Sequence, residues 1–342
     1  MYQRYYGLRE SPFELTPNPK FLFLTPRHRE ALSNVRYAIS ARKSLAVMIG
    51  EAGTGKTTLL RTALSQDAGS PVKWVYLNNP LLTREDFVRT LAMQFELGPR
   101  ASSSKAVFLD LFERALRERR AQGQISALVV DEAQSIDHAL LEEIRLLANI
   151  ETTEEKLLVV ILAGQPEFAA RLNEPELRQL KQRVALRCEL AAFDLAETAA
   201  YIVSRLETAG GTTRLFTRES VMAVHEHARG IPRTINVICD NALLSTFALG
   251  RKQVDRDIVL EVVRDFDLNA AAAAEPRFDS FDAAPADGAP RATAAQHQAP
   301  APVPLRAVPP QRPPAVDLSP SVESAIQAGV RRRRFVFFGA RS

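Results

Sequence analysis

The chain has 342 residues, of which 46% are hydrophobic and 25% charged, and its formal net charge is +4. This composition is typical of a globular protein with a hydrophobic core, and no apolar run approaches the roughly 18 residues that a membrane-spanning helix needs. Residues 269–342 contain nine arginines and six acidic residues and so carry +3 of this charge. Residues 1–268 are therefore close to neutral, which argues against a strongly basic nucleic-acid-binding core.

Predicted strands and helices alternate over the first part of the chain. Residues 1–43 are read as an extended arm interrupted by prolines, followed by a helix that begins near Arg27. Short apolar runs then predict four strands, at 44–50, 72–78, 126–132 and 156–164, and the alternating stretch at 184–190 predicts a fifth. Helical patterns occur between them, at 57–66, 83–97, 104–122 and 137–150. Buried strands joined by crossover helices indicate an α/β fold with three layers, in which helices cover both faces of a parallel sheet.

The pattern changes twice after the fifth predicted strand. From Asp194 to Asp267 it is purely helical, with candidate helices at 196–210, 217–230, 231–250 and 255–266, which predicts a small all-α domain. Residues 269–330 are rich in Ala and Pro and lack apolar periodicity, so we expect a disordered linker. The final stretch, RRRRFVFFGARS, indicates either contact with an anionic membrane or a partner, or a solvated basic terminus. The predicted domains are therefore 1–43, 44–193, 194–268, 269–330 and 331–342.

The stretch GEAGTGKTT lies between the first predicted strand and the next predicted helix. Its glycines and its Gly-Lys-Thr ending match the P-loop pattern, and this strand-to-helix position is the context that the motif requires. The glycines let successive backbone N–H groups point at phosphate oxygens, and Lys56 supplies a positive charge for the β- and γ-phosphates. The Thr57 hydroxyl is a candidate ligand of Mg²⁺. The predicted nucleotide-binding residues are Gly50, Glu51, Ala52, Gly53, Thr54, Gly55, Lys56, Thr57 and Thr58.

Two acidic residues end the third predicted strand, in the stretch ALVVDEAQ. Open parallel sheets bind ligands at the carboxyl ends of their strands. We therefore expect Asp131 to hold Mg²⁺ together with Thr57, and Glu132 to polarise an attacking water as general base. The pair predicts hydrolysis of the nucleotide and not only its binding.

Four more polar residues are candidates for contact with the γ-phosphate. Gln165 follows the fourth predicted strand and is either such a contact or a turn residue. Arg178 and Arg183 precede the fifth strand. In a ring of subunits either one could reach the nucleotide of the neighbouring subunit; alternatively, both belong to a solvated face. Arg233, in the stretch GIPRTIN, lies at a helix start, from which it either contacts nucleotide or pairs with an acid.

The order of these motifs resembles that of the AAA+ ATPases. More specifically, the chain resembles the general secretion pathway protein A (ExeA-like) family from its N-terminus to about Phe266. The stretches that carry the resemblance are YYGLRESPFELTPNPKFLFLTPRHREALSNVRYAI, GEAGTGKTTLLR, VVDEAQ, LAGQPEF, LRQLKQRV and GIPRTINVICDNALL. The resemblance implies that Tyr6, Phe13 and Leu15 lie near the adenine, although packing on the sheet edge is an equal alternative for each of them.

The family resemblance also implies a function. Long members carry a transmembrane helix and a peptidoglycan-binding domain after the ATPase, and this chain resembles in length the short members associated with pilus or exopolysaccharide export. We therefore expect an ATPase, with ATP and Mg²⁺ as cofactors, that energises or regulates assembly of a bacterial envelope secretion or export system. The implied partners are further copies of the chain in a ring and an inner-membrane component. The implied location is the cytoplasm, either free or at the periphery of the inner membrane, where Cys188 and Cys239 would be reduced.

Three alternatives remain. A DNA-binding AAA+ regulator of the transposition or origin-recognition type shares the motif order. DNA is nevertheless not an expected partner, because the core is near neutral and no helix-turn-helix module is recognised after the helical domain. A DEAD-like helicase is disfavoured because a second nucleotide-cleft domain is not recognised. A scaffold that binds nucleotide with very slow turnover is the third alternative.

Overall fold

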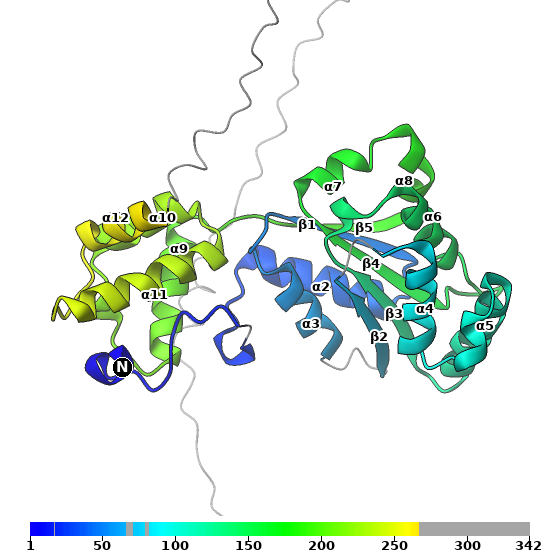
Figure 1. Cartoon of the computed structure of the whole chain (residues 1–342), viewed down its shortest axis with the longest axis horizontal. Coiled ribbons are helices and arrows are strands. Elements are labelled where there is room, and N and C mark those ends of the chain that lie inside the picture. Colours follow the sequence, from blue (N-terminus) through cyan, green and yellow to red (C-terminus); the bar gives the residue numbers. More distant parts are fainter. Residues whose placement is uncertain (17, 66–70, 79–81, 267–342) are drawn as a thin grey trace, which may run out of the picture. The chain divides into compact units, whose positions relative to one another are not determined.

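The computed structural model describes residues 1–16, 18–65, 71–78 and 82–266 (Figure 1). The predicted linker and the basic C-terminus, residues 269–342, lie outside the described residues. Within the described ranges, none of the helices combines the length and apolar composition needed to cross a bilayer.

A five-stranded parallel sheet forms the centre of the α/β part of the chain, with the strand order β2-β3-β4-β1-β5. All five predicted strands are present, with ends shifted by at most two residues. Three of them, β1, β3 and β4, are buried along their whole length, as expected of continuous apolar runs in a covered parallel sheet. The strands are β1 (Leu45–Gly50), β2 (Val72–Leu77), β3 (Ile125–Val130), β4 (Leu158–Gly164) and β5 (Val184–Leu190).

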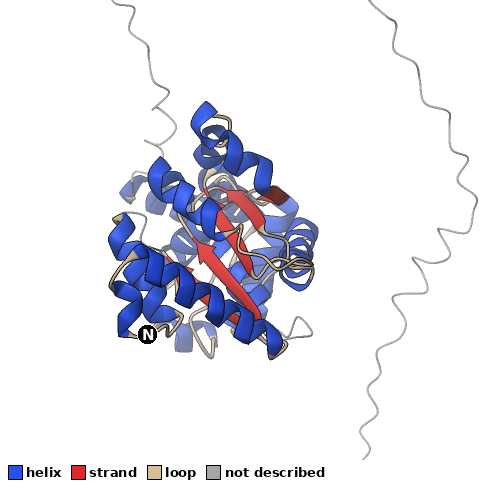
Figure 2. Cartoon of the chain, turned by 90° about the vertical axis from the view of Figure 1, so that its right-hand side faces the viewer, coloured by secondary structure: helices blue, strands red, loops and turns tan. Residues whose placement is uncertain are grey.

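Helices cover both faces of this sheet, as Figure 2 shows. Side chains alternate along β1, so that Leu45 and Val47 pack on one face while Ala46 and Met48 pack on the other. The first face is covered by α4 (Arg84–Gln94), α5 (Lys105–Ala121), α6 (His138–Leu147), α7 (Pro166–Arg171) and α8 (Arg178–Arg183). The second face is covered by α2 (Pro26–Ser40) and α3 (Lys56–Ser65). The predicted α/β fold with three layers is therefore confirmed.

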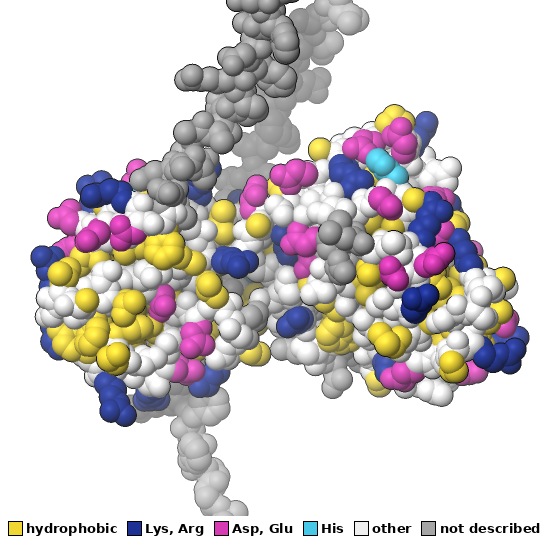
Figure 3. Space-filling view, in the orientation of Figure 1, with side chains coloured by type: hydrophobic (Ala, Val, Ile, Leu, Met, Phe, Trp, Pro, Cys, Tyr) yellow, Lys and Arg dark blue, Asp and Glu magenta, His cyan; other side chains and the backbone are white. Residues whose placement is uncertain are grey.

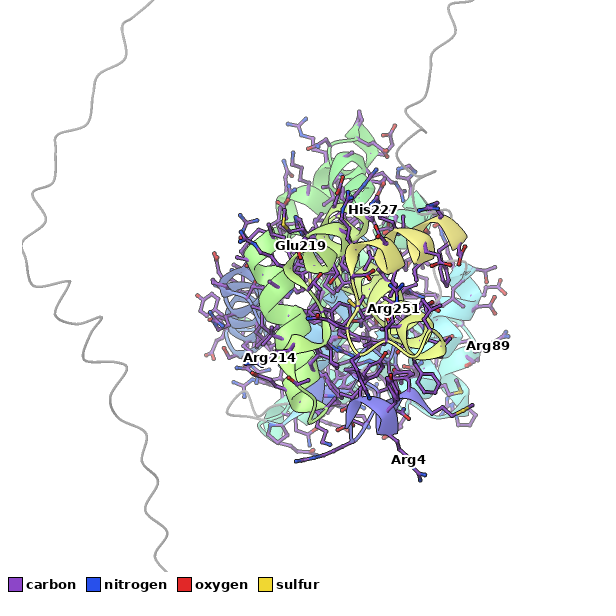
Figure 4. All side chains as sticks on the ribbon, turned by 90° about the vertical axis from the view of Figure 1, so that its left-hand side faces the viewer. Arg4, Arg89, Arg214, Glu219, His227 and Arg251 are labelled. Carbon is purple, nitrogen blue, oxygen red and sulfur yellow. The ribbon has the colours of Figure 1, made fainter. Side chains whose placement is uncertain are left out.

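The helices that follow β5, which we call the lid, form an all-α bundle, as predicted. Its helices are α9 (Leu195–Thr208), α10 (Arg218–Ala228), α11 (Pro232–Ala248) and α12 (Arg256–Asp265). Asp194 and Glu197 form a capping box that fixes the start of α9. Figure 4 views this end of the molecule and labels Arg214, Glu219 and Arg251, all exposed. Hydrophobic side chains also reach the lid surface in Figure 3, and the exposed ones on the lid include Met222, Leu244 and Leu249.

The N-terminal segment differs from the prediction. It begins with a short helix, α1 (Tyr2–Tyr6), rather than with extended chain. Tyr6 and Phe13 are buried in the hydrophobic core of the lid, where the Phe13 ring packs edge-on against Phe216 at 6.0 Å between ring centroids. The alternative that they pack on the sheet edge is therefore wrong, because the segment folds against the lid. Helix α2 begins at Pro26, close to the predicted start, after the N-cap Thr25.

Several shorter features complete the described chain. Both cysteines are buried free thiols, and burial raises the pKa of each, which agrees with the prediction of unpaired core thiols. Single turns of 3₁₀-helix connect the longer elements at Pro19–Phe21, Pro99–Ser102, Ala133–Ser135, Pro175–Leu177 and Thr213–Leu215.

Candidate nucleotide-binding site

The P-loop joins the end of β1 to the start of α3. Two of its glycines, Gly53 and Gly55, have φ values of +83° and +96°, which side chains disfavour. A Cβ on Gly55 would meet nothing within 4 Å, so the backbone there borders open space. The Thr54 hydroxyl donates to the carbonyl of Glu51 at 2.8 Å and so closes the turn from within. The loop is therefore held in shape by its own residues, at the N-terminus of a ten-residue helix.

Lys56 is buried beneath this loop. Its Nζ donates to the carbonyl oxygens of Gly50 at 2.7 Å and Glu51 at 3.0 Å. Among the described residues it forms no salt bridge, and burial lowers the pKa of its ammonium group against the opposing effect of nearby carboxylates, chiefly Asp131. A buried ammonium group bonded only to neutral oxygens gains electrostatic energy when an anion such as phosphate approaches.

The structure brings Thr57 and Asp131 together, although 74 positions separate them in the chain. The Thr57 hydroxyl donates to Asp131 Oδ2 at 2.8 Å, and Glu132 N–H donates to Asp131 Oδ1 at 2.9 Å. The Tyr76 hydroxyl also donates to Asp131 Oδ2, and burial together with this bond raises the pKa of Tyr76. A hydroxyl and a carboxylate are oxygen ligands of the kind Mg²⁺ prefers, so these residues fit that ion. In the described ranges no group of three or more His, Cys, Asp or Glu side chains could hold a metal, so phosphate and water oxygens would have to complete its shell.

Glu132 lies between two glutamine side chains. Its Oε2 accepts hydrogen bonds from Gln134 Nε2 at 2.5 Å and from Gln165 Nε2 at 3.2 Å. The Gln134 Oε1 atom in turn accepts from the backbone N–H of Gln165 at 3.0 Å, so the two amides are joined. Glu132 also has a φ of +53°, an uncommon conformation for a residue with a side chain and one often found at functional sites. The structure thus places Gln165 beside the acidic pair, as its position after the fourth strand predicted.

The start of helix α11 contacts the P-loop directly. The backbone N–H of Arg233 donates to the Gly53 carbonyl at 3.3 Å. A Cβ added to Gly53 would lie 2.7 Å from the Cβ of Arg233, so a glycine is needed for this approach. The Arg233 side chain itself is exposed and borders the same cavity as the P-loop. Arg178 and Arg183 are exposed on α8 and do not line this cavity. Their exposure is compatible with contact with a neighbouring subunit and equally with a solvated face.

A cavity of about 450 Å³ extends from the P-loop between the lid and the N-terminal segment. This volume is within the range of small-molecule sites. One part is polar and contains residues 52–59 with Glu132 and Arg233; the other part is rich in apolar and aromatic side chains, namely Leu15, Phe21, Leu22, Phe23, Leu24, Phe193 and Tyr201. Leu15 thus lines the cavity, whereas Tyr6 and Phe13 do not, so the expectation that these two lie near the adenine is wrong.

Comparison with known proteins identifies the domain. Residues 39–172 match the AAA domain family. The general secretion pathway protein A of Aeromonas hydrophila is 40% identical to the chain over 261 residues, which is 76% of this chain and 48% of that protein. The chain contains an AAA+ domain of the general secretion pathway protein A family. It spans about half the length of this curated relative.

Solved structures share the fold of this AAA+ domain at low identity. The ORC2 protein of Aeropyrum pernix, in ADPNP–ADP complexes, has a TM-score of 0.57 at 16% identity, covering 75% of this chain and 71% of that one. CDC6P of Pyrobaculum aerophilum has a TM-score of 0.60 at 18% identity, covering 75% of this chain and 70% of that one. At these identities the likeness shows the fold alone.

Sequence reasoning missed two residues of the AAA+ site, Tyr76 and Gln134. Tyr76 is near the end of β2, beside β3 in the sheet, and so lies next to the strand that carries Asp131. Gln134 is the last residue of the DEAQ stretch, which was singled out for its acids alone. A search for polar residues at the carboxyl ends of all strands would have found Tyr76.

Proposed function

We propose that the chain binds and hydrolyses ATP in this cavity. The observation that carries the proposal is the hydrogen bond between Thr57 and Asp131 beneath a formed P-loop, with Glu132 held by two amides beside it. Lys56 would exchange its bonds to loop carbonyls for phosphate oxygens. Thr57 and Asp131 would hold Mg²⁺, which supplies positive charge that offsets the charge developing on the phosphates during transfer.

Glu132 is the proposed general base. Its second carboxylate oxygen, Oε1, has no hydrogen-bond partner among the described residues, whereas Oε2 accepts from Gln134 and Gln165. The two amides hold the Glu132 carboxylate through Oε2, so Oε1 is free to take a proton from water. Gln165 would then act through two contacts, one to Glu132 and one to the γ-phosphate.

We further propose that ATP turnover serves assembly of a secretion or export system in the bacterial envelope. The support is the 40% identity to a general secretion pathway protein A across most of the described chain. Further copies of the chain in a ring would contribute Arg178 or Arg183 to the neighbouring site, which agrees with their exposure away from their own cavity. The proposed location is the cytoplasm, at or near the inner membrane.

A DNA-binding regulator is the alternative, because the fold neighbours include origin-recognition proteins, one of them the Drosophila ORC bound to DNA with a TM-score of 0.57 at 18% identity. The near-neutral charge of residues 1–268 counts against it.

The test is ATP turnover by the full chain as a function of protein concentration, alone and with duplex DNA or anionic liposomes. We expect turnover that rises with protein concentration, or with liposomes, and ignores DNA. Lys56→Ala should abolish both binding and turnover. Stimulation by DNA alone would replace the envelope role with the regulator, and ATP binding by Lys56→Ala with unchanged affinity would show that the phosphate site is misassigned.

A further inference from the structure

Three buried polar side chains form a chain of hydrogen bonds along the lid side of the cavity. Arg205 and Tyr201 belong to α9, and Asn236 belongs to α11. Arg205 Nη1 donates to the Tyr201 hydroxyl at 3.0 Å, and that hydroxyl donates to Asn236 Oδ1 at 2.9 Å. All three residues line the cavity, and Asn236 is only 7% exposed. Buried polar groups of this kind are expected to have all their hydrogen bonds satisfied.

The direction of these hydrogen bonds, from donor to acceptor, follows from the chemistry of arginine. A guanidinium group can only donate hydrogen bonds, so the Tyr201 oxygen is the acceptor of the first bond. Arg205 cannot turn away, because its Nε donates to the Pro12 carbonyl and its Nη2 to the Glu14 carbonyl at 3.2 Å. The Tyr201 O–H still has its own proton to donate, and the atom that it faces is the carbonyl oxygen of Asn236. The amide of Asn236 is thereby fixed, with its Nδ2 group as the remaining donor.

This amide donor lacks a partner within the described chain. Within the described residues Asn236 Oδ1 is satisfied, whereas Nδ2 forms no hydrogen bond and is not among the fully buried atoms that lack a partner, so it is open to the cavity. Asn236 follows Arg233 by one turn on the same helix, so it lies about 5 Å farther along α11 from the end that contacts the P-loop. Its partner Tyr201 packs against Phe193 and Phe23, at 5.3 and 5.6 Å between ring centroids. The donor thus belongs to the aromatic part of the cavity, whose flat side chains fit a base better than a sugar or a phosphate.

We propose that Asn236 Nδ2 donates a hydrogen bond to a ring nitrogen of the purine base of the bound nucleotide, and that Arg205 and Tyr201 hold the amide in the donating orientation. This inference rests on the proposed function and names the base-recognising residue of the same site. Adenine presents the acceptor nitrogens N1, N3 and N7, and one of them takes this bond. A site that offers a fixed donor, which a bound base would cover, disfavours a ligand that lacks the matching acceptor.

The test compares the full-length protein with Asn236→Leu by calorimetric titration in Mg²⁺ buffer. The ligands are ATP, tripolyphosphate and the 1-, 3- and 7-deaza analogues of ATP. Asn241→Leu is the matched control, since Asn241 is on the same helix, outside the cavity lining, with its amide bonded to the Val237 carbonyl. We expect Asn236→Leu to bind ATP about 10-fold more weakly, the loss expected for one hydrogen bond. Tripolyphosphate binding by this variant, and ATP binding by Asn241→Leu, should be unchanged.

The deaza series tests the inference without any mutation. The wild-type protein should bind one analogue about 10-fold more weakly than ATP, and for that analogue Asn236→Leu should cause no further loss. Equal binding of all four nucleotides by the wild type, or a loss in Asn236→Leu that is the same for tripolyphosphate, would overturn the role of Asn236 and leave the phosphate site standing. Failure of the wild type to bind either ATP or tripolyphosphate would overturn the proposed function and this inference with it.

Discussion

The two ends of helix α11 offer a matched test of how the lid is attached. Gly230 precedes the helix with a φ of +71°, and Gly250 follows it with a φ of +65°. A Cβ on Gly230 would lie 2.0 Å from the Phe193 carbonyl oxygen and 2.9 Å from the Phe193 nitrogen. A Cβ on Gly250 would meet nothing within 4 Å. Both positions impose backbone strain on alanine, but only Gly230 adds a collision with backbone.

The collision sets the size of the effect. Alanine at either position carries a strain of about 1 kcal/mol for its left-handed conformation. At Gly230 the chain must also separate from Phe193, whose N–H donates to the Gly230 carbonyl at 2.8 Å. Losing that bond costs about 1 kcal/mol, and displacing the packed segment around Phe193 costs about 1 kcal/mol more. Gly230→Ala should therefore destabilise the protein by about 3 kcal/mol, against about 1 kcal/mol for Gly250→Ala.

Thermal unfolding followed by circular dichroism measures the difference. For a protein of this size 1 kcal/mol corresponds to about 2–4 °C in Tm, so Gly230→Ala should lower the Tm by about 6–12 °C and Gly250→Ala by about 2–4 °C. Gly230→Ala should also weaken ATP binding, because Arg233 and its contact with Gly53 follow three residues later. Equal Tm values for the two variants would refute the reasoning that the close approach of Phe193 requires glycine.

Three more predictions concern the site. Glu132→Gln should bind ATP normally and lose turnover by at least about 100-fold, the usual contribution of a general base; turnover near the wild-type rate would remove Glu132 from that role. In concentrated protein, Arg178→Ala or Arg183→Ala should lower turnover by about 10³-fold with ATP affinity unchanged, and normal rates for both variants would mean that neither acts in trans. Burial lowers the pKa of His28 against the opposing effect of its ring's hydrogen bond to the Thr54 carbonyl at 3.3 Å, so the folded state favours the neutral ring. Stability should thus be constant above about pH 6.5, the unfolded-state pKa, and fall below it by up to about 1.4 kcal/mol per pH unit until the lowered pKa of the folded state is reached. Urea unfolding from pH 7.5 to 5 should show a smaller slope for His28→Gln, and an identical slope would exclude His28 as the source.

Local patterns were sufficient for the five strands, the longer helices and the phosphate site. Three of the five strands, β1, β3 and β4, are runs of buried apolar residues. Such a run is recognisable without tertiary information, because it is typical of a strand that is covered on both faces. The P-loop was also predictable, because its strand, turn and helix are contiguous and its backbone conformation depends on glycines within it. Asp131 and Gln165 could be predicted to lie near the loop, because polar residues at the carboxyl ends of parallel strands share one edge of the sheet.

The N-terminal segment shows where local patterns fail. Its aromatic residues are apolar enough to be buried, but nothing in their spacing says against which surface. The Tyr6 hydroxyl donates to the carbonyls of Leu243 and Arg251, more than 230 positions away, so its place depends on the completed lid. Burial of apolar surface has no direction, and any exposed apolar face of the folded chain could have accepted these rings.

The sequence by itself determined which residues form the five strands and the longer helices and which backbone cradles phosphate, because these features depend on neighbours along the chain. Tertiary structure alone decided the strand order, in which β4 separates β1 from β3, and the bonds by which Gln134 joins Glu132 to Gln165. It also decided the docking of the lid, which lines up Arg205, Tyr201 and Asn236 beside the cavity. Hydrogen bonds between side chains form only where folding has brought donors and acceptors within about 3 Å, and that distance is a property of the packed chain.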